Sequence, residues 1–245
     1  MTDCPPRTTR RADALAVLVA LVLPLMLVMV YFVILAPYPP ALQQTAYALG
    51  KIVQFALPVV WVFAVQRSRF AWKKPGLGGL AEALAFGVAI AAAMLVLYHA
   101  WLNPAGYLDV AREPVRQRLG GYGLTSLPMY VLFGLFVSLV HSFLEEYYWR
   151  WFVFGQLRRL VPLWPAIVIS SLGFMLHHVV VLATYFGWFS PATLLFSLAV
   201  ALGGGVWAWI YHRTGSLYGP WLSHLLVDVA IFVVGYDLVG GCFGP

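Results

Sequence analysis

Charge is scarce in this sequence. Asp, Glu, Lys and Arg make up only 10% of the 245 residues, whereas 62% are hydrophobic and the mean hydropathy is +0.84. Soluble domains carry about 25% charged residues, so the composition argues against a soluble globular protein and indicates an integral membrane protein. The length suits about seven spans of roughly 20 residues with short loops. We therefore expect a single membrane domain over residues 1–245.

Cysteine is almost absent as well. Cys4 and Cys242 are the only two, and in a seven-span chain they would lie on opposite sides of the membrane. This excludes a disulfide framework and a cysteine-based metal site. An HExxH zinc motif is also missing, as are the paired broken helices in two repeated halves that are typical of a transporter.

Long apolar runs dominate what is present. They predict an all-α fold, a polytopic transmembrane helix bundle of about seven to eight spans. The first run follows basic residues like a signal peptide, but its length and the lack of a small-x-small cleavage site favour an anchor. Residues 102–123 predict an interfacial helix with its arginines facing water. The runs cover residues 14–36, 46–66, 77–101, 126–157, 162–185, 191–212 and 217–239.

The basic residues are distributed asymmetrically. Arg7, Arg10 and Arg11 precede the first run, and further clusters follow the second, fourth and sixth runs. By the positive-inside rule this predicts a cytoplasmic N-terminus in a multi-pass protein of the plasma (inner) membrane. Topology and anionic lipid account for the net charge of +6, so we expect no nucleic-acid partner.

Ionisable residues at membrane depth are the main functional signal. A charge at the bilayer centre costs at least about 2.5–3.5 kcal/mol, so such residues need a reason to be there. They gather in three short clusters on the late spans rather than being scattered. These residues are His141, Glu145, Glu146, Arg150, His177, His178, His224 and Asp228.

The first cluster, residues 145–150, contains two adjacent glutamates that face different directions. Glu146 and Arg150 are four residues apart on one helix face and can pair, which makes them structural. Glu145 is turned about 100° away, so it is available for chemistry.

The second cluster, residues 174–178, is expected at the same membrane depth as the first. Glu145 lies 16 residues before Val161, and His178 lies 16 residues after Pro162. In an antiparallel hairpin both would lie roughly 24 Å from the turn, at 1.5 Å rise per residue. A carboxylate and an imidazole at equal depth can share one water. His177 would point about 100° away, which makes it the weaker candidate.

The third cluster places His224 and Asp228 on one helix face, four residues apart. A simple hairpin would leave His224 too shallow to meet the others. Gly215, Gly219 and Pro220 would allow the preceding turn to dip into the protein, so that this helix starts below the surface.

These residue types suit peptide hydrolysis, which needs a base for water, a proton donor for the leaving amine and donors for the oxyanion. Glu145 could take the proton from water, His178 could hold that water, and His224 could face the oxyanion. The competing interpretation of each histidine is an interhelical hydrogen bond without catalysis.

Three motifs in order carry a family resemblance. Glu145-Glu146…Arg150, Phe174…His178 and His224…Asp228 follow the patterns EExxxR, FxxxH and HxxxN or HxxxD. In this respect the chain resembles the CAAX protease and bacteriocin-processing (Abi) family of intramembrane glutamate proteases, with the likeness covering about residues 126–239. The resemblance implies a membrane endopeptidase without a metal cofactor.

The resemblance also implies roles for individual residues. Glu145 and His178 would activate water, His224 with Asp228 would stabilise the oxyanion, and Glu146, Arg150 and Phe174 would support the site structurally. Ionised aspartate cannot donate a hydrogen bond as asparagine does, so Asp228 must be protonated or must orient His224 instead. The implied partner is a membrane-associated protein or peptide, cleaved at a C-terminal tail, leader or sorting signal.

Two other functions are consistent with the same residues. His178, His224 and a carboxylate are acceptable ligands for a catalytic zinc ion. A non-catalytic membrane scaffold or bacteriocin-immunity protein would use the polar clusters only for helix association.

Overall fold

The computed structural model describes residues 8–68, 73–240 and 243. Cys4, Arg7, Arg69 and Cys242 lie outside these ranges, and so do the predictions that concern them. The described residues form helices and turns without a β-strand, which confirms the predicted all-α fold.

Ten α-helices follow one another in the described part of the chain, several of them continued by π-helical segments. The α-helices are α1 (Arg10–Met29), α2 (Pro40–Val59), α3 (Leu77–Leu97), α4 (Asp109–Gly121), α5 (Leu127–Phe136), α6 (Ser142–Glu146), α7 (Gly155–Leu160), α8 (Leu163–Phe186), α9 (Pro191–Thr214) and α10 (Tyr218–Val239). The π-helical segments are η1 (Val30–Ile34), η2 (Val60–Val65), η3 (Tyr98–Leu102), η4 (Val137–His141) and η5 (Tyr147–Phe154).

Seven continuous helical stretches of the described chain are long and apolar enough to cross a membrane. They confirm the seven predicted runs and a multi-pass integral membrane protein. The first two begin earlier than predicted, at Arg10 and Pro40. The first span begins at Arg10 because the Thr9 side chain caps α1 by accepting a hydrogen bond from the Ala12 amide. The second begins at Pro40 because proline is favoured at the first position of a helix.

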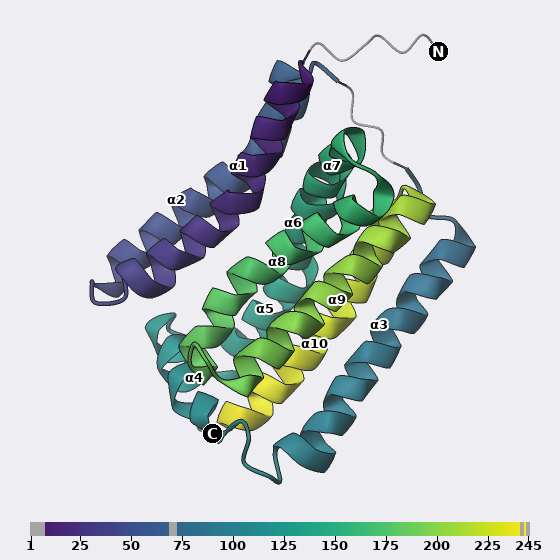
Figure 1. Ribbon diagram of the computed structural model, residues 1–245. Coiled ribbons are helices and arrows are strands. Elements are labelled where there is room, and N and C mark those ends of the chain that lie inside the picture. Colours follow the sequence, from purple (N-terminus) through teal and green to yellow (C-terminus); the bar gives the residue numbers. More distant parts are fainter. Residues whose placement is uncertain (1–7, 69–72, 241–242, 244–245) are drawn as a thin grey trace.

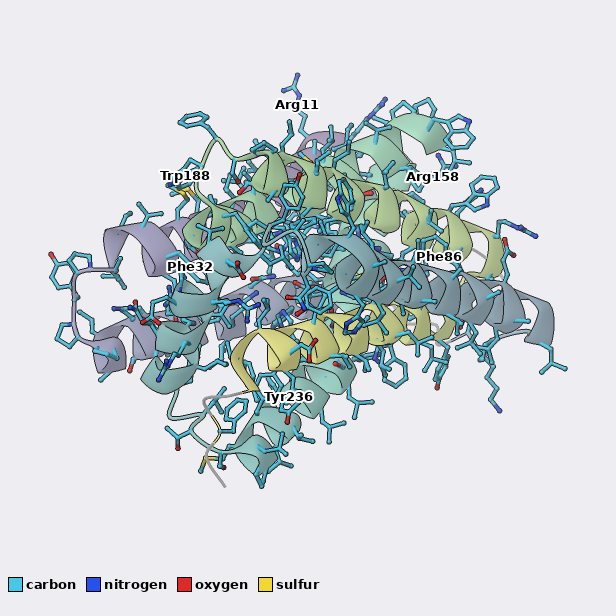
Figure 2. The ribbon with its side chains drawn as sticks, turned by 90° about the horizontal axis from the view of Figure 1, so that it is seen from below. Arg11, Phe32, Phe86, Arg158, Trp188 and Tyr236 are labelled. Atoms are coloured by element: carbon cyan, nitrogen blue, oxygen red, sulfur yellow. The ribbon has the colours of Figure 1, made fainter. Side chains whose placement is uncertain are left out.

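The spans form a layered bundle (Figure 1). Helices α8 and α9 pack against each other along its centre, α3 packs along α10 on one side, and α1 and α2 lie together on the other. Side chains fill the space between the helices, while that of Arg11 extends outward (Figure 2). The late spans, which carry the ionisable residues, therefore lie between α3 on one side and α1 with α2 on the other.

Successive spans reverse direction, which gathers most basic clusters at one end. The start of α1, the end of α2, the α7–α8 turn and the end of α9 all lie at this end, and α4 lies at the other (Figure 1). The structure thus places the basic clusters on one side of the bundle, as their positions in the sequence predicted. Which end faces the cytoplasm stays a prediction from the positive-inside rule.

A buried polar network ties α1, α2 and α7 together at the basic end. Gln66 donates to Asp13 at 2.9 Å and to Gln156 at 3.0 Å, and Gln156 donates back to Gln66. Arg159 lies 3.6 Å from the Asp13 carboxylate. Because buried polar groups are satisfied in stable folds, this network fixes the register of the first two spans against α7.

A helix is present within residues 102–123 as α4, and two of its arginines also bind neighbouring groups. Arg112 donates to Asp109 and to the carbonyl oxygen of Leu238. The Arg118 guanidinium lies 4.7 Å over the ring of Phe32. The Arg112 side chain is still 41% exposed, so it contacts water and its protein partners at once.

Close helix contact predicts a stability effect at Gly87 of α3. A Cβ there would lie 2.9 Å from the Ser223 Cα and 3.0 Å from its carbonyl oxygen, both backbone atoms of α10. We expect Gly87→Ala to destabilise the fold by about 1–3 kcal/mol, measured as thermal unfolding in detergent. Gly78→Ala, in the same helix with open space around it, is the control and should be neutral or slightly stabilising. Equal stability of the two variants would contradict this packing.

Candidate active site

The two adjacent glutamates lie on α6, a short α-helical stretch between the π-helical segments η4 and η5. Glu145 is 4% exposed and Glu146 is fully buried. The π-helix is rare and occurs preferentially at functional sites. Because its hydrogen bonds run from i to i+5, side chains around α6 depart from the regular 3.6-residue spacing assumed from the sequence.

Glu146 and Arg150 form the predicted ion pair in the bundle interior. Arg150 Nε lies 3.1 Å from Glu146 Oε2, and both side chains are almost completely buried. The guanidinium also lies 4.7 Å over the ring of Phe174 and 5.2 Å over that of Trp207. Charge pairing and aromatic faces thus replace the hydration that burial removes.

Gly204 of α9 allows this arrangement. Its carbonyl oxygen accepts a hydrogen bond from Arg150 Nη2 at 3.4 Å. A Cβ at this position would lie 3.2 Å from Phe174 Cδ1 and 3.5 Å from Arg150 Nη2. Any side chain here would press against the buried guanidinium and its aromatic neighbour.

The Glu145 carboxylate is turned away from that pair and lies among imidazoles. Its Oε1 is 3.4 Å from His141 Nε2 and 3.5 Å from His177 Nε2. Its Oε2 is 3.8 Å from His224 Nε2. The predicted division between a paired glutamate and a neighbour free of that pair is confirmed.

His178 lies at the same carboxylate, as the depth argument predicted. Glu145, His177 and His178 each offer an atom within 4.8 Å of the others. His178 Nδ1 lies 2.9 Å from the Phe174 carbonyl oxygen. A carbonyl only accepts, so Nδ1 carries the proton and Nε2 of the neutral ring keeps its lone pair.

The expectation that His177 points away from Glu145 is wrong. His177 is buried with Nε2 at 3.5 Å from Glu145, and its ring centroid is 4.1 Å from that of His178. Successive helical side chains diverge by about 100°, so a group facing the midline between them is within reach of both. Helix α8 presents that midline to Glu145.

His224 reaches both glutamates from α10. Its Nδ1 lies 2.8 Å from Glu146 Oε1, a carboxylate already paired with Arg150, so this nitrogen donates. Its ring stacks on Trp207 with centroids 4.3 Å apart. Its Nε2 is 3.6 Å from Asp228 Oδ1. The sequence placed His224 and Asp228 on one face, but only the structure reveals the bond to Glu146.

The turn before α10 is buried only in part. Ser216, Leu217, Gly219 and Pro220 are buried, whereas Gly215, which adopts a left-handed conformation with φ of 65°, is exposed. The first turn of α10 is thus enclosed by protein, which brings His224 level with α6.

Two aromatic residues of the site carried no usable signal in the sequence. Trp149 stacks on His177 with an interplanar angle of 3°, and Trp207 stacks on His224 at 18°. The chain has 10 tryptophans, and nothing in their spacing marks these two as the ones that orient imidazoles.

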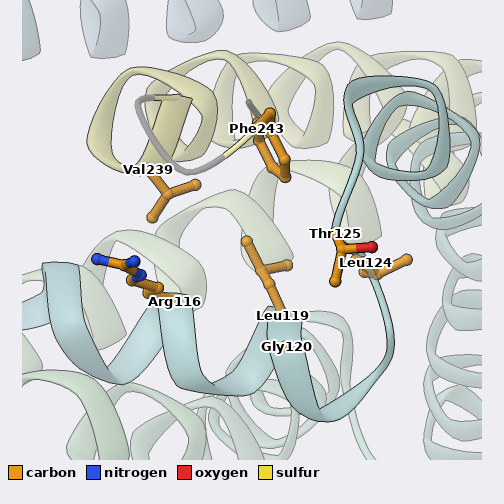
Figure 3. Close-up of a pocket in the computed structure, with 7 residues that line it drawn as sticks. All are labelled: Arg116, Leu119, Gly120, Leu124, Thr125, Val239 and Phe243. Atoms are coloured by element: carbon orange, nitrogen blue, oxygen red, sulfur yellow. The ribbon is translucent and has the colours of Figure 1, made fainter. Parts of the chain in front are cut away.

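The pocket in Figure 3 is separate from this cluster. It measures about 180 Å³ and lies between α4, the turn that follows and the end of α10. Arg116 is the one charged residue in its lining, and none of the clustered carboxylates and histidines contributes to it.

Breaking the buried ion pair should cost folded protein. We expect Glu146→Ala or Arg150→Ala to destabilise the chain by about 3–5 kcal/mol, because each leaves an uncompensated buried charge. The measurement is the folded yield after membrane extraction together with thermal unfolding.

Arg213→Ala is the matched control for this prediction. It removes a pair with Glu82 of similar length, 2.9 Å, whose side chains are 53% and 45% exposed. Such a surface pair contributes about 0–1 kcal/mol. An equal loss in the control and the buried-pair variants would contradict a structural role specific to Glu146 and Arg150.

Comparison with known proteins gives one family. A family model described as type II CAAX prenyl endopeptidase Rce1-like matches residues 127–230. The match confirms the resemblance drawn from the three motifs and covers all the clustered residues of α6, η5, α8 and α10. Neither the curated proteins nor the solved structures provide a match.

Proposed function

Residues 127–230 of this chain belong to the type II CAAX prenyl endopeptidase Rce1-like family, and we propose that Glu145 and His178 activate the water with which it cleaves its substrate. The family makes the chain a membrane-embedded protease, acting on a membrane-associated protein. The observation that carries the proposed mechanism is the single buried carboxylate facing imidazoles from several helices.

The spacing of Glu145 and His178 suits one shared water. Two groups that each bind a water at about 2.8 Å are separated by roughly 4–5 Å, and a carboxylate oxygen of Glu145 and a ring nitrogen of His178 lie within 4.8 Å of each other. In the proposed mechanism both groups offer a lone pair to the water, the histidine through Nε2. The water would donate a hydrogen bond to each, which leaves its oxygen lone pair directed at the peptide carbonyl.

The reaction then follows from these positions. The water oxygen attacks the carbonyl carbon, its proton moves to Glu145, and the carbonyl oxygen becomes an oxyanion. Glu145 passes the proton to the leaving amine as the C–N bond breaks. A buried, preorganised site makes such transfers efficient because no solvent has to reorganise.

His224 is the proposed donor to the oxyanion. Its Nδ1–H is held by Glu146, so it can donate through Nε2 only when it carries both ring protons. Asp228, 3.6 Å from that nitrogen, is a partner for the resulting imidazolium. This role for Asp228 is orientation of His224, which does not require the aspartate to donate a hydrogen bond.

A zinc enzyme is the second candidate, and the geometry changes its ligand set. Among the described residues, the set close enough to hold a metal is Glu145, His177 and His178, rather than His178, His224 and a carboxylate. Zinc takes three such ligands and a water in catalytic sites. We favour the metal-free mechanism because Glu145 is then free to act as the base.

Removing either water-binding group should abolish cleavage. We expect Glu145→Gln and His178→Ala to lower kcat by at least about 100-fold, within the usual range for a general base. The measurement is proteolysis of membrane proteins in cells, followed by comparison of the membrane proteome with and without Glu145→Gln.

Chelation separates the two mechanisms in the same assay. The metal-free enzyme keeps its activity after dialysis against a chelator, whereas loss of activity that zinc restores would establish the metalloprotease instead. A membrane proteome that is the same with folded wild-type protein and with folded Glu145→Gln would support the non-catalytic scaffold and refute both.

The position of His177 leads to a further prediction. His177 stacks on Trp149 and approaches Glu145, so His177→Ala should reduce kcat by about 10- to 100-fold through misorientation of the carboxylate. His178→Ala should cost more, because it also removes a ligand of the water. Kinetics of both variants at equal folded concentration test this order, and a His177→Ala enzyme with wild-type kcat would exclude a role in orienting Glu145.

A further inference from the structure

A polar cavity of about 580 Å³ lies at the end of the bundle that carries α4, opposite most of the basic clusters (Figure 1). Its lining comes from η1, α2, α4, α8 and the turns beside them, and most of it consists of tyrosine, glutamine and threonine side chains. Arg118 is the one charged residue in this lining. The positive-inside rule, which accounts for the basic clusters at the other end, gives no reason for this arginine, and the proposed mechanism does not use it.

The Arg118 guanidinium is held by aromatic rings and keeps most of its hydrogen-bond donors. Its central carbon lies 5.3 Å from the ring centroid of Tyr31 and 4.7 Å from that of Phe32. Its Nη1 donates a long hydrogen bond of 3.4 Å to the Tyr31 hydroxyl, and Tyr185 of α8 interacts with the same group. Because a guanidinium has five N–H donors in its plane, several of them remain for a ligand.

Arg118 also lacks an acidic partner within the part of the chain that the structure describes, where no carboxylate forms an ion pair with it within 4.0 Å. The two acidic residues of α4 bond to other side chains. Asp109 accepts a hydrogen bond from Arg112 at 2.7 Å, and Glu113 accepts one from Gln117 at 2.9 Å. A half-buried cation is costly unless it is paired, so the cavity favours an anionic ligand.

The cavity wall adds a further donor and is fixed across helices. The hydroxyl groups of Tyr31 and Tyr122 form a hydrogen bond with each other. Such a pair uses one hydroxyl hydrogen, and the other remains available to a ligand. The Gln44 amide donates to the Gly121 carbonyl at 2.9 Å, which connects α2 to the end of α4. Guanidinium and hydroxyl donors on a fixed wall suit the oxygens of a phosphate group.

Exposed apolar side chains flank the cavity on η1 and α2. Ile34, in the same π-helical segment as Tyr31, is 57% exposed, and Leu42, next to Gln43, is 48% exposed. On membrane-spanning helices such side chains contact acyl chains. Basic pockets between transmembrane helices bind the head groups of anionic lipids, so a ligand with both a phosphate and apolar tails fits this place better than a free anion.

We propose that this cavity binds the head group of an anionic phospholipid, with Arg118 as the charged ligand of its phosphate. The guanidinium donates to the phosphate oxygens, the Tyr31–Tyr122 hydroxyl pair contributes one further donor, and the acyl chains lie along η1 and α2. The cavity volume is within the usual range for such sites, about 300–1,000 Å³. The bound lipid connects α4 and α8 to the first two spans, and this role goes beyond the proposed proteolysis.

Photolabelling tests the proposal at the site itself. The full-length protein in detergent is incubated with phosphatidylglycerol that carries a photoactivatable group on its head, and labelled peptides are mapped by mass spectrometry. We expect labels on the segments of η1, α2, α4 and α8 that line the cavity. Unlabelled phosphatidylglycerol should displace the probe at about 10- to 100-fold lower concentration than phosphatidylcholine, whose choline cation opposes Arg118, as for hydrogen bonds to a charged group.

Two arginines of α4 provide matched variants. Arg118→Gln should reduce the preference for phosphatidylglycerol to about 1. Arg116→Gln removes the same charge from the same helix, but Arg116 lines the separate pocket of Figure 3, so this variant should keep the wild-type preference. Arg118→Lys should keep part of it, because an ammonium retains the charge but not the planar set of donors.

Three results would overturn the proposal. Labels that all lie outside the cavity lining of the wild-type protein would place the lipid elsewhere, whatever the stability of the variants. Equal losses of preference in Arg118→Gln and Arg116→Gln would indicate a general attraction to the basic residues of α4. Displacement of the probe by inorganic phosphate as readily as by phosphatidylglycerol would identify a soluble anion instead of a lipid.

Thermal unfolding checks the fold and keeps this inference distinct from proteolysis. A ligand that binds only the folded state stabilises it. Phosphatidylglycerol should therefore raise the unfolding temperature of wild-type and Glu145→Gln protein alike, and more than phosphatidylcholine does. If Arg118→Gln does not fold, an undiminished preference in Arg118→Met, which keeps an apolar stem against Phe32, would equally refute the assignment.

Discussion

The rest of the site depends on the interactions of the buried Glu146 carboxylate. It pairs with Arg150 one turn later on its own span and accepts a hydrogen bond from His224 on α10. Arg150 in turn bonds to the carbonyl of Gly204 on α9 and lies over the ring of Phe174 on α8. One glutamate thus connects the four late spans, in a setting where an unpaired charge would be severely destabilising.

Fixing Glu146 also fixes its neighbour. Because adjacent residues on a helix point in different directions, the connection through Glu146 directs Glu145 toward the histidines of η4, α8 and α10. The aromatic rings of Trp149 and Trp207 then hold His177 and His224 by stacking. Glu146 thus connects the helices, whereas Glu145 faces the imidazoles that the proposed mechanism uses.

The early spans also contact the cluster of carboxylates and histidines. Helix α1 accepts a hydrogen bond from Tyr148 through the Ala20 carbonyl, and α2 brings Phe55 and Lys51 to the edge of the cluster. The buried Asp13–Gln66–Gln156 network holds this helix pair in register. Two helices outside the family match thus contact residues at the edge of the buried cluster.

The sequence by itself determined the all-α membrane fold, the seven spans, the Glu146–Arg150 pair and the approach of His178 to Glu145. These follow from apolar run length and helical spacing, which are local properties. Only the tertiary structure decided that His177 also reaches Glu145 and that His224 bonds to Glu146. Those contacts depend on how separate helices rotate and pack against one another, including the π-helical segments around α6, and no local periodicity encodes that.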